Sequence, residues 1–114
     1  HLDFPDFEGE LPAVIARGSV LALPDGLGPG PAAMTEPLAC AVHAAGRVEA
    51  GPGATVLVLG GGVQGQFMTA LLARRGCRVL VADPHPERRE RALRFGAAGA
   101  LEAPRDEAAV ARAR

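Results

Sequence analysis

The chain has 114 residues, a net charge of −1 and 48% apolar residues, so it holds at most one ordinary domain with a real core. A charge so close to zero gives no electrostatic reason to expect nucleic acid or an anionic membrane as a partner. No stretch reaches the roughly 18 continuous apolar residues of a membrane span, so no membrane partner is expected.

The missing residue types exclude several kinds of chemistry. All twelve basic residues are Arg, and Lys, Tyr, Trp and Asn are absent. Without Lys there is no Walker A loop, and without Tyr and Lys there is no short-chain dehydrogenase pair. Ser19 is the only Ser, and it lies outside any G-x-S-x-G nucleophile elbow. Cys40 and Cys77 lie in apolar settings typical of buried free thiols, so we expect a reducing, cytoplasmic location.

The first part of the chain predicts short extended pieces and turns. Residues 13–16 and 20–23 predict two short strands around an Arg-Gly-Ser turn. Residues 24–26, with the sequence Pro-Asp-Gly, predict a tight turn. The Gly- and Pro-rich residues 27–33 predict a connector.

Residues 35–46 predict a helix, because Thr35 or Glu36 can cap it and Ala is the best helix former. Gly46 is the predicted C-terminal cap. The helix is apolar nearly all round, so we expect it to be buried. His43 is then more often a satisfied buried histidine than a ligand, since no second ligand lies nearby at metal spacing.

Residues 55–83 predict a strand, a glycine turn, a helix and a second strand that ends on an acid. Residues 55–59 are apolar without alternation, as in a parallel strand buried on both faces. Gly60, Gly62 and Gly65 follow in the spacing G-x-G-x-x-G. In such a turn the first Gly permits the tight bend, the second lets the backbone approach a pyrophosphate, and the third lets the helix lie close to the sheet.

The helix after the turn carries an apolar stripe of Val63, Phe67, Ala70 and Leu71. It is predicted to end at Gly76, a residue that tolerates the left-handed conformation of a C-terminal cap. Its N-terminus presents N–H groups and a partial positive charge to the phosphates.

Residues 78–82 predict the second buried strand, and Asp83 ends it where a carboxylate accepts hydrogen bonds from an adenosine ribose. Strand, turn, helix, strand and acid together indicate a dinucleotide site. The alternative is a glycine-rich turn in another α/β protein, with Asp83 only starting a turn before Pro84.

Beyond this acid, a helix is predicted from Pro86 to about Phe95, with an Arg-rich solvated face. Residues 99–102 predict a weak third strand. The strand at 55–59 is expected to be an edge in this chain, because the strand that belongs on its far side is missing.

The segments TEPLACAVHA, GATVLVLGGGVQG, VADPHPER and FGA together resemble a zinc-type medium-chain dehydrogenase/reductase, nearest to the polyol and threonine dehydrogenases. The resemblance covers roughly residues 13–103. It implies an α/β fold with the first half of a Rossmann-type doubly wound parallel sheet, preceded by the tail of a GroES-like catalytic domain. Residues 1–30 would be that tail and a connector, and residues 31–114 the partial NAD(P)-binding domain.

The resemblance also implies a function: hydride transfer between NAD and a small-molecule alcohol, polyol or carbonyl, in a homo-oligomeric parent enzyme. It places the cofactor-binding residues at Gly60, Gly62, Val63, Gln64, Gly65, Asp83 and Arg88. Glu36 matches a position beside the catalytic zinc of the polyol-type branch.

The departures from the family pattern limit this expectation. The main zinc ligands and the four-cysteine zinc lobe of the family have no counterpart here, and no catalytic residue is assigned. Gln64 and Gln66 replace residues that are usually apolar, and Gln66 has no predicted role. The chain is therefore expected to be a central fragment that is inactive alone. A self-contained, non-catalytic NAD-binding or regulatory module is the alternative, and a flavin-binding Rossmann domain is less favoured.

Overall fold

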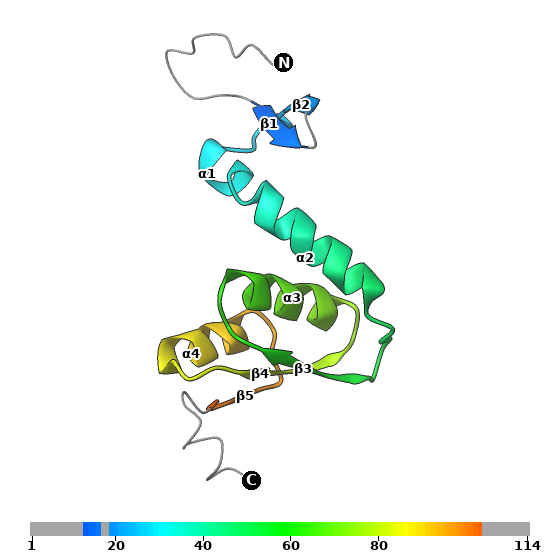
Figure 1. Cartoon of the computed structure of the whole chain (residues 1–114), viewed down its shortest axis with the longest axis vertical. Coiled ribbons are helices and arrows are strands. Elements are labelled where there is room, and N and C mark those ends of the chain that lie inside the picture. Colours follow the sequence, from blue (N-terminus) through cyan, green and yellow to red (C-terminus); the bar gives the residue numbers. More distant parts are fainter. Residues whose placement is uncertain (1–12, 17–18, 104–114) are drawn as a thin grey trace. The chain divides into compact units, whose positions relative to one another are not determined.

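The computed structural model describes residues 13–16 and 19–103 (Figure 1). The chain divides into two compact units, His1–Ala39 and Cys40–Arg114, and the division falls inside a helix. The domain boundary expected after residue 30 stays a prediction, because a division in packing is not an evolutionary boundary.

The first unit contains an antiparallel pair of strands, as predicted. Strand β1 (Ala13–Ala16) pairs with β2 (Ser19–Ala22), and Ala13 lies opposite Ala22. The tight turn that follows is also confirmed: the N–H of Leu27 donates to the carbonyl of Pro24 at 3.2 Å, and Gly26 has a φ of +85°.

The connector predicted at 27–33 contains a single helical turn, α1 (Pro29–Ala32). Pro29 stands at the start of this helix, where its fixed φ suits the first helical position and its missing N–H costs nothing. The prolines predict a connector, whereas Pro29 begins a helix.

The helix predicted at residues 35–46 is present as α2 (Thr35–Arg47), but it is not buried as expected. Ala41 and Ala45 are its buried residues, His43 is exposed, and Gly46 lies within the helix rather than capping it. A helix that is apolar all round needs cover on all sides. The core of the second unit reaches it at Ala45.

The second unit is a three-stranded parallel sheet in the order β3 (Thr55–Leu59), β4 (Arg78–Ala82) and β5 (Gly99–Leu101). Helix α3 (Val63–Arg74) joins the first two strands, and α4 (Pro86–Arg94) joins the last two. Because the chain crosses the sheet in one direction, both helices lie on the same face (Figure 1). The α/β prediction of half a Rossmann-type sheet is confirmed.

The core lies between this face and the two helices. It consists of Ala45, Leu72, Cys77, Val79, Val81 and Ala92. The buried side chains of α3 are Gln66, Thr69 and Leu72, whereas Val63 of the predicted apolar stripe is 54% exposed. Hydrophobic periodicity missed this face because two of its three buried residues are polar.

Strand β3 is an edge of the sheet in the described part of the chain, as predicted. Its alternate residues Val56 and Val58 pack against the core, while Leu57 and Leu59 are 53% and 79% exposed on the other face. The expected burial on both faces is therefore not met, because helices cover one face only.

Arg75 attaches the C-terminal end of α2 to the sheet unit. Its Nη2 donates to the carbonyl of Ala45 at 2.7 Å, and its Nη1 donates to those of Val48 at 3.0 Å and Ala50 at 3.3 Å. The planar guanidinium thus satisfies carbonyls at the end of one helix from the end of another. Gly76 follows with a φ of +91°, as expected of a C-terminal cap.

None of the helices in the described ranges is long and apolar enough to cross a membrane.

Gly65 is where α3 lies against the turn that follows β3. A Cβ built on Gly65 would overlap the carbonyl oxygen of Gly60. We expect Gly65→Ala to lower the free energy of unfolding by about 1–3 kcal/mol or more, the usual cost of overpacking. Urea unfolding followed by far-UV circular dichroism measures this loss, since the chain has no Trp or Tyr.

Gly46→Ala is the matched control, because Gly46 is also helical and a Cβ there meets nothing within 4 Å. It should leave stability unchanged or raise it by up to about 1 kcal/mol through helix propensity. Equal stability of the two variants would contradict the close approach at Gly65.

Candidate functional site

The glycine turn joins β3 to α3 at the carboxyl ends of the strands. Gly60 has a φ of +98°, a left-handed conformation that side chains rarely adopt, and its N–H donates to the carbonyl of Ala82 at 2.8 Å. The turn therefore leaves β3 while still bonded to the end of β4. These contacts suit the role predicted for the first glycine.

Gly62 is the N-cap of α3, and it faces open space. A Cβ built there meets nothing within 4 Å, and no side chain caps the helix N-terminus. Val63 and Gln64 follow as exposed residues in the first helical turn. The turn is thus packed at Gly65 and open at Gly62, which is the arrangement that lets an anion approach the helix N-terminus.

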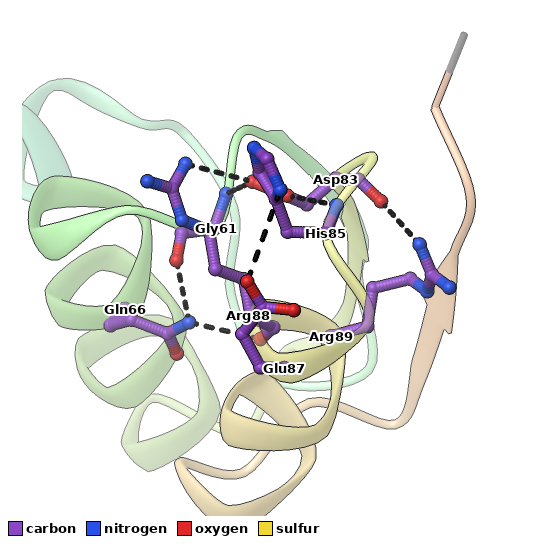
Figure 2. A network of polar contacts seen from close by, with 7 residues as sticks. All are labelled: Gly61, Gln66, Asp83, His85, Glu87, Arg88 and Arg89. Carbon is purple, nitrogen blue, oxygen red and sulfur yellow. Dashed lines mark hydrogen bonds and ion pairs between the residues drawn. The ribbon is translucent and has the colours of Figure 1, made fainter. Parts of the chain in front are cut away.

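Asp83 follows β4 and lies beside the glycine turn, although its side chain is only 2% exposed. One carboxylate oxygen, Oδ2, accepts a hydrogen bond from the N–H of Gly61 at 2.7 Å. The other, Oδ1, accepts one from the N–H of His85, also at 2.7 Å (Figure 2). The acid that ends the second strand therefore binds the turn that follows the first.

The ionisation of Asp83 follows from these contacts. Burial raises the pKa of the carboxyl, but hydrogen bonds from the N–H groups of His85 and Gly61 lower it, and so does the positive charge of Arg88. The net effect holds the pKa of Asp83 below its ordinary value, so the group is a carboxylate at neutral pH.

Two arginines of α4 surround the acid. The Nη1 of Arg88 lies 3.7 Å from Oδ2 of Asp83, and the Arg88 side chain is 46% exposed. Arg89 donates from its Nη1 to the main-chain carbonyl of Asp83 at 2.9 Å. Arg88 and Asp83 were predicted to share the ribose end of a nucleotide, and they lie together here.

Two residues of this network, Gly61 and Gln66, have no role predicted from the sequence. Gly61, the unassigned position of the G-x-G spacing, is buried, and a Cβ there would lie 3.3 Å from Cβ of Arg88 and 3.4 Å from Cβ of Asp83. Gln66 is buried and donates from its Nε2 to the carbonyls of Gly61 and Arg88. The run of three glycines was the one available hint for Gly61.

Glu36 is an exposed residue in the first turn of α2. Across the described ranges, no group of three or more His, Cys, Asp or Glu side chains is arranged to hold a metal ion. The residues of this part of the chain therefore do not fit a zinc site, and the expected role of Glu36 beside zinc stays a prediction.

The site has three features that suit ligand binding. It combines an open helix N-terminus, open space at Gly62 that a Cβ would enter, and an ionised carboxylate beside a half-exposed guanidinium. An anionic pyrophosphate followed by a ribose matches these three features in order. A dinucleotide such as NAD therefore fits the residues present.

No protein-family model matches the sequence. Its curated relatives include L-galactonate-5-dehydrogenase of Escherichia coli (strain K12), 44% identical over 66 residues that make up 58% of this chain and 19% of that protein. They also include sorbitol dehydrogenase of Bacillus subtilis (strain 168), 35% identical over 79 residues that make up 68% of this chain and 22% of that protein. The chain thus spans about a fifth of the length of these relatives.

Solved structures give the same likeness. One is a protein of Clostridium scindens ATCC 35704, assigned as a zinc-binding dehydrogenase. The match covers 82% of this chain and 27% of that protein, at a TM-score of 0.70 and 30% sequence identity. Another is an alcohol dehydrogenase of E. coli CFT073 in complex with NADH. That match covers 85% of this chain and 29% of that protein, at a TM-score of 0.71 and 27% sequence identity. The resemblance to the zinc-type medium-chain dehydrogenases/reductases is therefore confirmed over about a fifth of the length of the curated relatives.

Proposed function

We propose that the chain binds the adenosine diphosphate half of NAD, as the nucleotide-binding part of an alcohol or polyol dehydrogenase. The observation that carries this proposal is the open space at Gly62, at the uncapped N-terminus of α3 and close to the carboxylate of Asp83. The relatives are dehydrogenases, and one similar structure contains NADH.

The residues would divide the nucleotide between them. The backbone of Gly62, Val63 and Gln64 would hold the pyrophosphate, because a helix N-terminus carries a partial positive charge that attracts anions. Gly60 and Gly65 would shape the turn that receives the ligand. The remaining lone pairs of the Asp83 carboxylate would accept the ribose hydroxyls beside the Arg88 guanidinium.

The chemistry of the whole enzyme is also part of the proposal. Bound NAD would supply the hydride acceptor or donor, and the substrate would be a small alcohol, polyol or carbonyl compound, as the names of the relatives suggest. A homo-oligomeric parent enzyme, an inactive isolated chain and the GroES-like tail stay predictions. The alternative of a self-contained NAD-binding module has no separate observation in its favour.

The cytoplasmic location expected from the sequence also stays a proposal. Cys77 is buried, as expected, whereas Cys40 is exposed. The expected burial of Cys40 is therefore wrong.

The open space at Gly62 gives a direct test. In Gly62→Val the added methyl groups should occupy the pyrophosphate position and weaken ADP binding by about tenfold or more, a loss of roughly 1.4 kcal/mol. Stability should fall by no more than about 1 kcal/mol, since the substituent enters solvent rather than the core. Titration calorimetry measures the affinity, and Gly46→Val is the control that should keep it. Undiminished affinity of Gly62→Val would place the ligand elsewhere.

Asp83 should select NAD over NADP, because a 2′-phosphate would meet its carboxylate. Two like charges 4 Å apart repel by about 1 kcal/mol even in water, which corresponds to roughly fivefold in affinity. Asp83→Ser should narrow the preference by at least about that factor, and Asp25→Ser in the exposed turn should not. A chain that already prefers NADP would refute the assignment of Asp83.

The lowered pKa of Asp83 also predicts an acid dependence of stability. Its contribution is fully present above the unfolded-state pKa of about 4 and is lost as pH falls through the lower folded-state value. Urea unfolding between pH 7 and pH 3 should show a stability gap between the unmodified chain and Asp83→Asn that closes in acid. Asp25→Asn is the control, and a gap independent of pH would contradict the ionised, hydrogen-bonded carboxylate.

A further inference from the structure

Gln66 is a buried polar side chain that the glycine motif does not require. It lies in the first turn of α3 and is 5% exposed. Its amide nitrogen, Nε2, donates to the carbonyl of Gly61 at 2.8 Å and to the carbonyl of Arg88 at 3.2 Å (Figure 2). Both partners are acceptors, so the atom between them must be the NH₂ group, and the orientation of the amide follows from chemistry.

This bridge has a cost that an apolar residue would avoid. The amide oxygen, Oε1, is buried and has no hydrogen-bond partner in the part of the chain that the structure describes. A buried acceptor without a partner destabilises a protein by about 1–3 kcal/mol. A polar residue kept against such a cost is expected where the structure serves binding as well as folding.

The two carbonyls belong to different elements of the candidate site. Gly61 lies in the turn that would hold the pyrophosphate, and Arg88 lies in the first turn of α4, at the ribose end. Asp83 links the same two residues through their other groups, because it accepts from the Gly61 N–H and pairs with the Arg88 guanidinium. Gln66 and Asp83 thus close a ring of contacts around Gly61 and Arg88.

The ring holds the main chain of Arg88 in place but leaves its guanidinium half exposed. The separation between the glycine turn and α4 decides whether this guanidinium reaches Asp83, 3.7 Å away, or extends toward a bound ribose. An Arg88 side chain released from Asp83 would attract the phosphate that distinguishes NADP from NAD.

From these contacts we propose that Gln66 is a positioning residue of the nucleotide site. It fixes the first turn of α4 against the glycine turn, keeps Arg88 paired with Asp83, and so sets the preference for a ribose with a free 2′-hydroxyl. This inference rests on the proposed nucleotide-binding function. It adds a determinant of selectivity that does not itself contact the ligand.

The test compares two ligands that differ only at the 2′ position of the ribose. Adenosine 5′-monophosphate and adenosine 2′,5′-bisphosphate are titrated into the 114-residue chain by calorimetry, and the ratio of their dissociation constants is the readout. In Gln66→Leu the preference for the monophosphate should fall by roughly three- to tenfold, the range that a hydrogen bond of ordinary net strength corresponds to.

Thr69→Val is the matched control. Thr69 is also fully buried on α3, and its Oγ1 donates to a backbone carbonyl, that of Gly65, at 2.7 Å. The control should lose stability but keep the ratio within about twofold, because its bond does not reach α4. A ratio that is unchanged in Gln66→Leu, or equally changed in Thr69→Val, would leave Gln66 a purely structural residue and overturn the inference.

Two further measurements decide the remaining outcomes. If Gln66→Leu does not fold, Gln66→Met keeps the length of the side chain without a donor and should show the same fall in the ratio. If neither variant folds, the side-chain amide signals of Gln66 in the unmodified chain are followed by NMR. They should shift differently with the two ligands, and identical shifts would overturn the inference.

The failure of the inference is distinguishable from failure of the proposed function. An unmodified chain that binds neither ligand would overturn the proposed function, and the role of Gln66 with it. An unmodified chain that binds the monophosphate, together with a Gln66→Leu variant of unchanged ratio, would overturn the role of Gln66 alone.

Discussion

The carboxylate of Asp83 is the contact on which the candidate site depends. A buried charge is costly unless it is fully hydrogen-bonded, and here each oxygen accepts a backbone N–H. One bond reaches Gly61 after β3, and the other reaches His85 before α4. The acid therefore joins the ends of two parallel strands and the start of a helix. The approach at Gly61 is close, since a Cβ there would lie 3.4 Å from Oδ2 of the carboxylate.

The glycine turn separates folding from binding within a few residues. Gly65 must be glycine because α3 lies against the carbonyl of Gly60, which is a requirement of packing. A Cβ on Gly62 would meet nothing within 4 Å among the residues that the structure describes, so packing there does not require glycine. In the proposed function, the pyrophosphate takes this open space. The same motif thus carries two glycines whose physical reasons are independent.

Sequence reasoning worked where the signal is local. The bounds of β3 and β4 follow from runs of aliphatic residues that end at glycine or an acid, and the edge position of β3 follows from counting strands. It failed where the deciding partner is distant in sequence: Gln66 binds the carbonyl of Arg88, and α2 is exposed because burial depends on neighbours. The apolar stripe of α3 misled for a related reason, since Thr69 and Gln66 are buried by hydrogen bonding rather than by hydrophobicity.

Arg75 and Arg88 hold neighbouring parts of the unit by different kinds of force, and ionic strength should separate them. Arg75 binds three neutral carbonyls, so its attachment of α2 includes no ion pair for salt to screen. Arg88 faces a carboxylate from a half-exposed position, where dissolved ions weaken the attraction. Concentrated salt would therefore loosen the ribose end of the site while leaving the helix attachment intact, and the selectivity of the protein would vary with its ionic surroundings before its fold did.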